Sequence, residues 1–479
     1  MRLRSAKCHN NLAFTTILSV FILNACTVGP DYQRPTTATP ATFVQASHPE
    51  FSELKVETAW WKLFKDAQLT HLVEQTILHN HDLQAAQANL REARALYMEA
   101  GLNLAPSVTT HANYNDQQRS VAALNNRTFV PRDLKLYNLG FDAFWEIDLF
   151  GRVQRNVEAS NHEVDAVEAD LRDLSVSLIA EVARNYFECR GLQQQLDIIV
   201  KNAENQAQTL AVIRVKLTNG RGSELDAART AAQLDATRAS LPPLHTAIGQ
   251  ALHRLSVLTG QVPGALTQQL TIPAASSKAP SIIQIGRPAE LLRRRPDIRS
   301  AELALAASTA RIGVATADLF PRVTFVGTIA LESNSLSGLG AAGADSYSLG
   351  PRISWAALDL GRVYARIKAA DAHAEASLAH YQQTVLNALE ETENALLTYN
   401  QARARQSLLT TAAQASSQAN SLAHLRFEKG AIDFLPVLDT ELSLLQDQNQ
   451  LAQSEKATAL ALVAVYKALG GGWDTAVGL

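Results

Sequence analysis

Residues 138–148 read NLGFDAFWEID and alternate apolar with mostly polar side chains. This alternation is typical of a β-strand with one apolar face, because successive side chains of a strand point to opposite sides. Trp145 lies near one end of the stretch, where an aromatic ring suits the boundary between membrane and water. The stretch therefore predicts an amphipathic strand suited to a membrane β-barrel, although a soluble sandwich could show the same pattern.

The sequence is internally duplicated, so this strand has a counterpart in the second half. The matching pairs include Gly140 with Gly350, Trp145 with Trp355, Gly151 with Gly361, Gly220 with Gly430 and Leu225 with Leu435. The same order of elements is expected in residues 66–270 and 271–479: a helix, a β-hairpin, a long helix and a returning helix. The hairpins are expected at about residues 106–147 and 321–356.

Four strands cannot close a barrel by themselves, since about eight are needed. An open sheet edge is not tolerated in lipid either, because its backbone groups would have no hydrogen-bond partners. If the predicted strands span a membrane, several chains must share one barrel. The fold class predicted is therefore mostly α-helical, with a membrane β part built from more than one chain.

The longest helical patterns cover residues 148–217 and 359–427. Their apolar residues recur at three- and four-residue spacing and alanines are frequent, which favours coiled-coil packing. A helix of about 70 residues is about 105 Å long, so each is expected to project from the membrane into the periplasm. Pro242 and Pro243 predict a kink in the first returning helix, whereas the second half has no proline at the aligned positions.

Each long helix ends at a glycine that can reverse the chain. Gly220 and Gly430 suit the left-handed position that follows a helix. Ser223 and Asp226 are predicted to form a capping box for the next helix. Asp433 is predicted to cap the equivalent helix of the second half.

Residues 1–25 are typical of a secretory signal peptide, with basic residues ahead of an apolar stretch too short to span a bilayer. Leu23-Asn24-Ala25-Cys26 resembles a bacterial lipobox, which predicts cleavage before Cys26 and lipid attachment to it. An ordinary signal peptide followed by a chance cysteine is the alternative. Thr27 does not match the aspartate of an inner-membrane retention signal, so residues 26–65 are expected to be a lipidated segment at the outer membrane.

The sequence shows no catalytic constellation, and neither an enzymatic activity nor a cofactor or metal is expected. His162-Glu163 begins a metalloprotease-like pattern, but the residue at position 166 is alanine rather than histidine. Cys189 is predicted to be a buried structural thiol. The net charge of −3 does not indicate nucleic-acid binding, and the run 293–295 of three arginines is interpreted as a solvated junction between a loop and a helix.

Four motifs together resemble the TolC-like outer-membrane factor family, in the NodT-like lipoprotein branch that serves multidrug efflux pumps. They are CTVGPDY (26–32), FWEIDLFGR (144–152), RRPDI (294–298) and YKALGGGW (466–473). The resemblance implies a homotrimer with a shared barrel of twelve strands above a periplasmic helical tunnel. It also implies two partners: a periplasmic adaptor of the membrane fusion type, and an inner-membrane transporter of the resistance-nodulation-division type.

The resemblance further implies a gate beside the second glycine turn. Asp439 would form an acidic ring with Arg426 as its partner, and Asp433 belongs to the same segment. Phe427 departs from related ducts, which have a tyrosine there, so one hydrogen bond of the gate is expected to be absent. The alternative role for Asp439 is a first-turn acid favoured by the helix dipole.

Two other functions remain open from the sequence. The chain could be the outer-membrane duct of a type I protein secretion system. It could also be a structural lipoprotein that spans the periplasm without forming a channel. The paired amphipathic strands favour a channel, and the transported substrate is not indicated by any motif.

Overall fold

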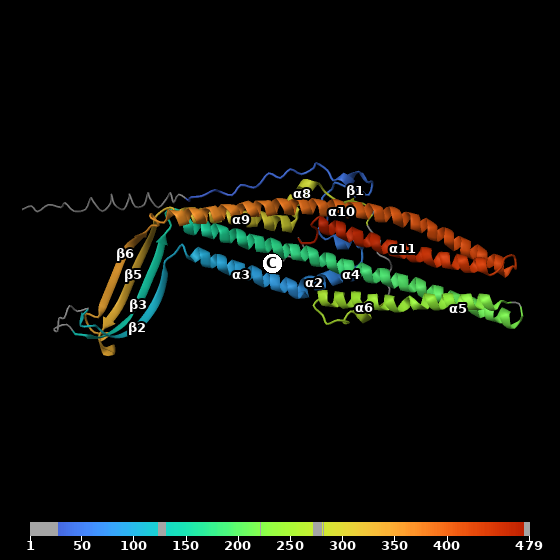
Figure 1. The fold of residues 1–479 in the computed structure, drawn as a ribbon, viewed down its shortest axis with the longest axis horizontal. Helices are drawn as coiled ribbons and strands as arrows, with labels where there is room; N and C mark the ends of the chain where they lie inside the picture. The colour runs from blue at the N-terminus through green and yellow to red at the C-terminus, as the bar shows by residue number, and fades with distance from the viewer. Residues whose placement is uncertain (1–26, 123–130, 221, 272–279, 281, 474–479) are drawn as a thin grey trace, which may run out of the picture. The chain divides into compact units, whose positions relative to one another are not determined.

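The computed structural model describes residues 27–122, 131–220, 222–271, 280 and 282–473, so Cys26 lies outside the described residues. The chain is mostly helical (Figure 1). It divides into two compact units, each built from three separated stretches. Unit 1 comprises Met1–Thr36, Asn89–Val167 and Ser300–Tyr381, and unit 2 comprises Thr37–Ala88, Glu168–Arg299 and Gln382–Leu479.

Unit 1 contains a four-stranded antiparallel sheet in the order β2-β3-β5-β6 (Figure 1). Its strands are β2 (Ser107–Gln118), β3 (Asp133–Ile147), β5 (Arg322–Ser333) and β6 (Asp345–Ser354). The two strands of each predicted hairpin are neighbours, and β3 and β5 join the hairpins.

The register of this sheet separates apolar from polar side chains. One row across the four strands consists of Val108, Ala143, Gly327 and Leu349. The adjacent row, on the opposite face, consists of Thr109, Asp142, Thr328 and Ser348. Large side chains of the apolar face are exposed, with Leu349 58% exposed and Ile329 62% exposed. The apolar face is therefore not covered by any of the described residues.

The long helices are α4 (Arg152–Thr218) and α10 (Leu360–Glu428), and the helices before the hairpins are α3 (His81–Leu102) and α9 (Pro296–Ala317). The returning chain of the first half forms α5 (Glu224–Ala239) and α6 (Leu241–Leu258), whereas that of the second half is the single helix α11 (Leu435–Ala468). The predicted interruption in the first half alone is therefore confirmed. The two prolines lie in the first turn of α6, where a missing N–H is tolerated.

Residues 43–66 contribute to the core of unit 2. Trp60 is fully buried and stacks on Tyr466 of α11 with ring centroids 5.1 Å apart. The short strand β1 (Phe51–Ser52) pairs in parallel with β4 (Ile283–Gln284). Asp66 caps α2 (Ala67–His79) by accepting two backbone N–H groups. The remaining short elements are η1 (Val44–Ser47), η2 (Trp60–Phe64), α7 (Thr267–Leu270), α8 (Pro288–Arg294) and η4 (Leu336–Gly338).

Within the described part of the chain, every helix is too short or too polar to cross a bilayer. The same residues include no cluster of three or more His, Cys, Asp or Glu side chains arranged to bind a metal ion. Cys189 is buried in α4, and burial raises the pKa of its thiol to about 11. The thiol is therefore protonated at neutral pH, which suits a packing role rather than a nucleophilic one.

Candidate functional site

The turn between α10 and α11 has the geometry of a Schellman motif. The Ala431 N–H donates to the Arg426 carbonyl at 2.9 Å, and the Gly430 N–H donates to the Phe427 carbonyl at 3.0 Å. Gly430 has a φ of +70°, a conformation in which a Cβ atom would be strained. Gly220 has the same φ after α4, and its N–H donates to the Leu217 carbonyl.

The two returning helices begin differently from each other. Ser223 caps α5 by accepting the Leu225 N–H at 3.1 Å, and the described residues show no reciprocal bond from the Ser223 N–H to the Asp226 carboxylate. Asp433 does not cap α11, which corrects the expectation from the sequence. The N-cap is Phe434 and no side chain caps the helix. Pro436 in the first turn has no N–H, so this end has one donor fewer to satisfy.

Phe427 is held inside unit 2 beside the turn. Its ring meets the ring of Phe434 edge-on at 5.5 Å, and the Lys216 ammonium of α4 lies 3.8 Å from its ring centre. Both rings belong to an apolar cluster whose buried members are Ile213, Ala423, Phe434, Val437 and Leu438. The phenyl ring thus joins α4 to the turn by packing and a cation–π contact rather than by a hydrogen bond.

Arg426 and Asp439 are both exposed, and these two described residues form no ion pair within one chain. Arg426 lies in the last turn of α10. Asp439 lies beyond the first turn of α11, whose first turn contains no acidic residue. The helix dipole acts mainly within the first turn, so it accounts poorly for an acid at position 439.

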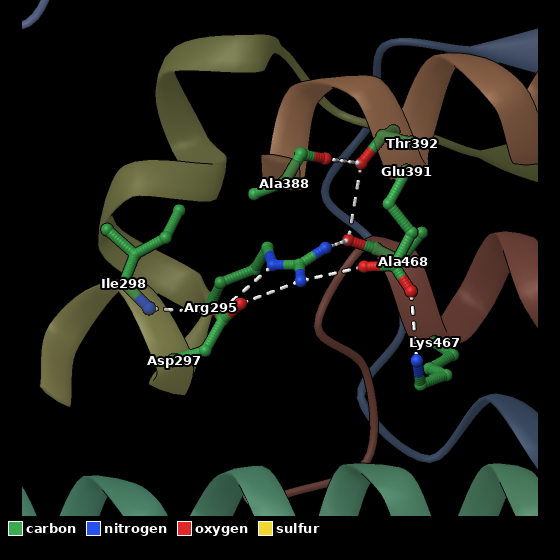
Figure 2. Close-up of polar contacts among 8 residues, drawn as sticks. All are labelled: Arg295, Asp297, Ile298, Ala388, Glu391, Thr392, Lys467 and Ala468. Carbon is green, nitrogen blue, oxygen red and sulfur yellow. Dashed lines mark hydrogen bonds and ion pairs between the residues drawn. The ribbon is translucent and has the colours of Figure 1, made fainter. Parts of the chain in front are cut away.

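The arginine run 293–295 differs from its sequence interpretation. Arg295 is only 9% exposed, so it is not solvated. Its guanidinium donates to both carboxylate oxygens of Asp297, to Glu391 Oε2 at 2.8 Å and to the Ala468 carbonyl at 2.8 Å (Figure 2). One side chain therefore ties together the start of α9, the middle of α10 and the end of α11.

The contacts around Arg295 continue through α10 and α11. Lys467 Nζ donates to Glu391 Oε1 at 2.9 Å, and the Thr392 hydroxyl donates to the Ala468 carbonyl at 3.3 Å (Figure 2). Glu391 is thus held by two cations. A cavity of about 160 Å³ adjoins the cluster and is also lined by Asp173, whose pKa is raised to about 6 by burial and by the nearby Asp297. These polar groups lie together inside unit 2. We call the cluster the Arg295 junction; it consists of Arg295, Asp297, Glu391, Thr392, Lys467, Asp173 and the Ala468 carbonyl.

A family model and individual relatives show which proteins this chain resembles. The family model described as outer membrane efflux protein matches residues 72–261 and 288–471. The solvent efflux pump outer membrane protein SrpC of Pseudomonas putida is 30% identical, over 96% of this chain and 98% of that protein. Outer membrane protein OprJ of Pseudomonas aeruginosa is also 30% identical, over 96% of each chain.

Solved structures of outer-membrane channels resemble this chain over nearly its whole length. The outer-membrane channel OprN is 42% identical and superposes with a TM-score of 0.87, covering 94% of this chain and all of that one. The open state of the MtrE channel of Neisseria gonorrhoeae is 26% identical with a TM-score of 0.82, covering 94% of this chain and 99% of that one. The resemblance seen in the sequence motifs is confirmed. The chain therefore belongs to the outer membrane efflux protein family and acts as an outer-membrane channel in efflux.

Proposed function

We propose that three copies of this chain form one passive duct, with four strands from each copy closing a shared barrel in the outer membrane. The observation that carries this proposal is the sheet of unit 1. Its outermost strands, β2 and β6, each have one edge that pairs with no other described strand. An exposed edge is not tolerated in lipid, and pairing between copies would satisfy the backbone groups of both edges.

Aromatic residues at both ends of the sheet support the same placement. The indole N–H of Trp145 donates to the Leu104 carbonyl and that of Trp355 to the Leu319 carbonyl, each at 2.9 Å. Tyr114 and Tyr137 are paired in the register toward the other end of the strands, with ring centroids 4.7 Å apart. Aromatic side chains at both boundaries of an apolar band are typical of transmembrane barrels.

The duct is proposed to serve a tripartite pump, with a periplasmic adaptor and an inner-membrane transporter of the resistance-nodulation-division type that supplies the energy. The channel would then need neither a cofactor nor an enzymatic activity. The names of its relatives mention different substrates, namely solvent for SrpC and cations for CusC of Escherichia coli. A passive duct needs no selective pocket, so the substrate is proposed to be set by the transporter.

A lipid anchor on Cys26 is part of the proposal. The residues that follow are held in unit 1, where the Val28 N–H donates to the Phe150 carbonyl and Arg155 pairs with Asp31 at 2.6 Å. We expect the mature protein to carry acyl groups and Cys26→Ser to lose them, because Cys26 supplies the thiol to which the lipid is attached. Mass spectrometry of the intact protein measures this, and an unacylated wild type would contradict the anchor.

The gate is proposed to lie at Asp439 and Arg426, with Phe427 and Asp433 in the same segment. We expect a small, cation-favouring conductance that rises in Asp439→Ala and in Arg426→Ala, because each loses one partner of an ion pair between copies. The measurement is single-channel conductance of the purified protein in a planar bilayer. Asp197→Asn, which removes an exposed carboxylate of α4 that pairs with Lys201, is the matched control and should match wild type.

The outcomes of this experiment separate the duct from its gate. Unchanged conductance in both gate variants would keep the duct and place the gate elsewhere. Well-folded, reconstituted protein that never conducts would favour the structural lipoprotein over the channel.

A further inference from the structure

A buried carboxylate bridges three helices near the turn between α10 and α11. Glu441 of α11 is 8% exposed. Its Oε1 lies 2.9 Å from His424 Nε2 of α10 and accepts the Thr209 hydroxyl of α4 at 3.3 Å. Its Oε2 is buried and has no hydrogen-bond partner among the described residues. The carboxylate is therefore only partly satisfied, although it joins all three helices.

The apolar surroundings of Glu441 raise the free energy of a net charge on its carboxylate. The apolar cluster beside the turn includes Val437 and Leu438, which lie within four residues of Glu441 on α11. Burial raises the pKa of Glu441, and His424 and Thr209 oppose this shift without cancelling it. Lys216, the nearby cation of α4, sits over the Phe427 ring. Among the described residues, His424 is the titratable group in direct contact with this carboxylate.

We propose that the His424–Glu441 pair is a proton-operated latch that holds α4, α10 and α11 together at the gate. The inference rests on the proposed function as a gated duct. With one proton the pair has no net charge, either as an ion pair or as a neutral hydrogen bond. With no proton it leaves a buried, half-satisfied anion, and separation of the helices exposes that anion to water.

The direction of the pH dependence follows from the raised pKa. The packed, closed arrangement binds a proton more tightly than an arrangement in which Glu441 reaches water. Acid therefore stabilises closure: the stabilisation is fully present below the ordinary glutamate pKa of 4.5, and it is lost as pH rises through the raised pKa of Glu441 in the closed arrangement. One linked proton changes the ratio of open to closed states by at most about tenfold per pH unit.

The test is single-channel recording of the full-length protein in planar bilayers, at a series of pH values from about 5 to about 7.5. Wild type is expected to conduct severalfold more at the upper end than at the lower end. Glu441→Gln keeps both hydrogen bonds and has no carboxylate to ionise, so we expect low conductance that no longer rises with pH. A merely structural role predicts the opposite for this variant, namely a leaky channel.

Two further variants sharpen the result. Glu441→Asp retains a titratable carboxyl and should retain a pH dependence, whereas Asp197→Asn should behave as wild type. Repeating the comparison in an Asp439→Asn background separates the latch from titration of the proposed acidic ring. A conducting Glu441→Gln channel with the wild-type pH profile would overturn the latch and leave the duct intact. Absence of conductance in every variant would instead count against the proposed function.

Discussion

Replacement of Arg295 by methionine is expected to lower the free energy of unfolding by about 3–5 kcal/mol, the usual cost of removing one partner from a buried ion pair. Asp297 and Glu391 would each lose a guanidinium contact, and the Ala468 carbonyl at the end of α11 would keep only the Thr392 hydroxyl of its two donors. Methionine fills a similar volume, so the loss reports mainly the charge and its hydrogen bonds. Guanidinium unfolding of the detergent-solubilised protein, followed by circular dichroism, measures the change.

Arg293 is the matched control because it is exposed and belongs to the same arginine run. Arg293→Met should change the free energy of unfolding by no more than about 0.5 kcal/mol. If Arg295→Met prevents folding altogether, Arg295→Lys keeps the charge but loses the bidentate contact with Asp297, and should give a smaller measurable loss. Equal effects of the methionine substitutions at 293 and 295 would refute the Arg295 junction as a stabilising element.

Replacement of Leu349 by lysine is expected to destabilise the membrane-inserted protein by about 2–4 kcal/mol, the cost of a cation on the lipid face near the bilayer midplane. Leu349 is 58% exposed and lies in the apolar row of the sheet. In the proposed barrel this row faces lipid, where a charge loses its hydration. The measurement is the fraction of protein recovered from outer membranes as heat-resistant, folded barrel.

Ser348→Lys provides the control one residue away on the same strand. Ser348 lies in the polar row, which in the proposed barrel faces the aqueous lumen. We expect nearly normal insertion for this variant, with an effect on conductance instead. Similar losses from both lysine substitutions would mean that the two faces of the sheet do not differ in their contact with lipid.

The local pattern of the sequence carried much information about the elements. Period-two alternation of apolar and polar residues predicted strands where β3 and β6 lie. Successive side chains of a strand point to opposite faces of the sheet, so a sheet with one apolar face needs this alternation. The three-four spacing located the long helices to within a few residues of α4 and α10. Gly430 was singled out because a left-handed turn needs a residue without a side chain, and its φ is +70°. All these features depend on residues that are close together in the chain.

Features that depend on residues far apart in the chain could not be found in this way. Trp60 belongs to a segment without helical or strand periodicity, and its role follows only from stacking on Tyr466. The N-cap of α11 is Phe434 rather than Asp433, and that phenylalanine packs in the cluster beside the turn. No local sequence motif predicts the stacking of Trp60 or the N-cap at Phe434.

The sequence alone determined the family, the alternating strands, the long helices and the glycine turns, because each leaves a periodic or conformational signature in neighbouring residues. Only the tertiary structure decided which charged groups are buried together. Arg295 was interpreted as part of a solvated basic run, and no sequence pattern singled out Glu441. Both are buried because separate helices converge on them, and burial makes the free energy of a charge depend on partners distant in the sequence.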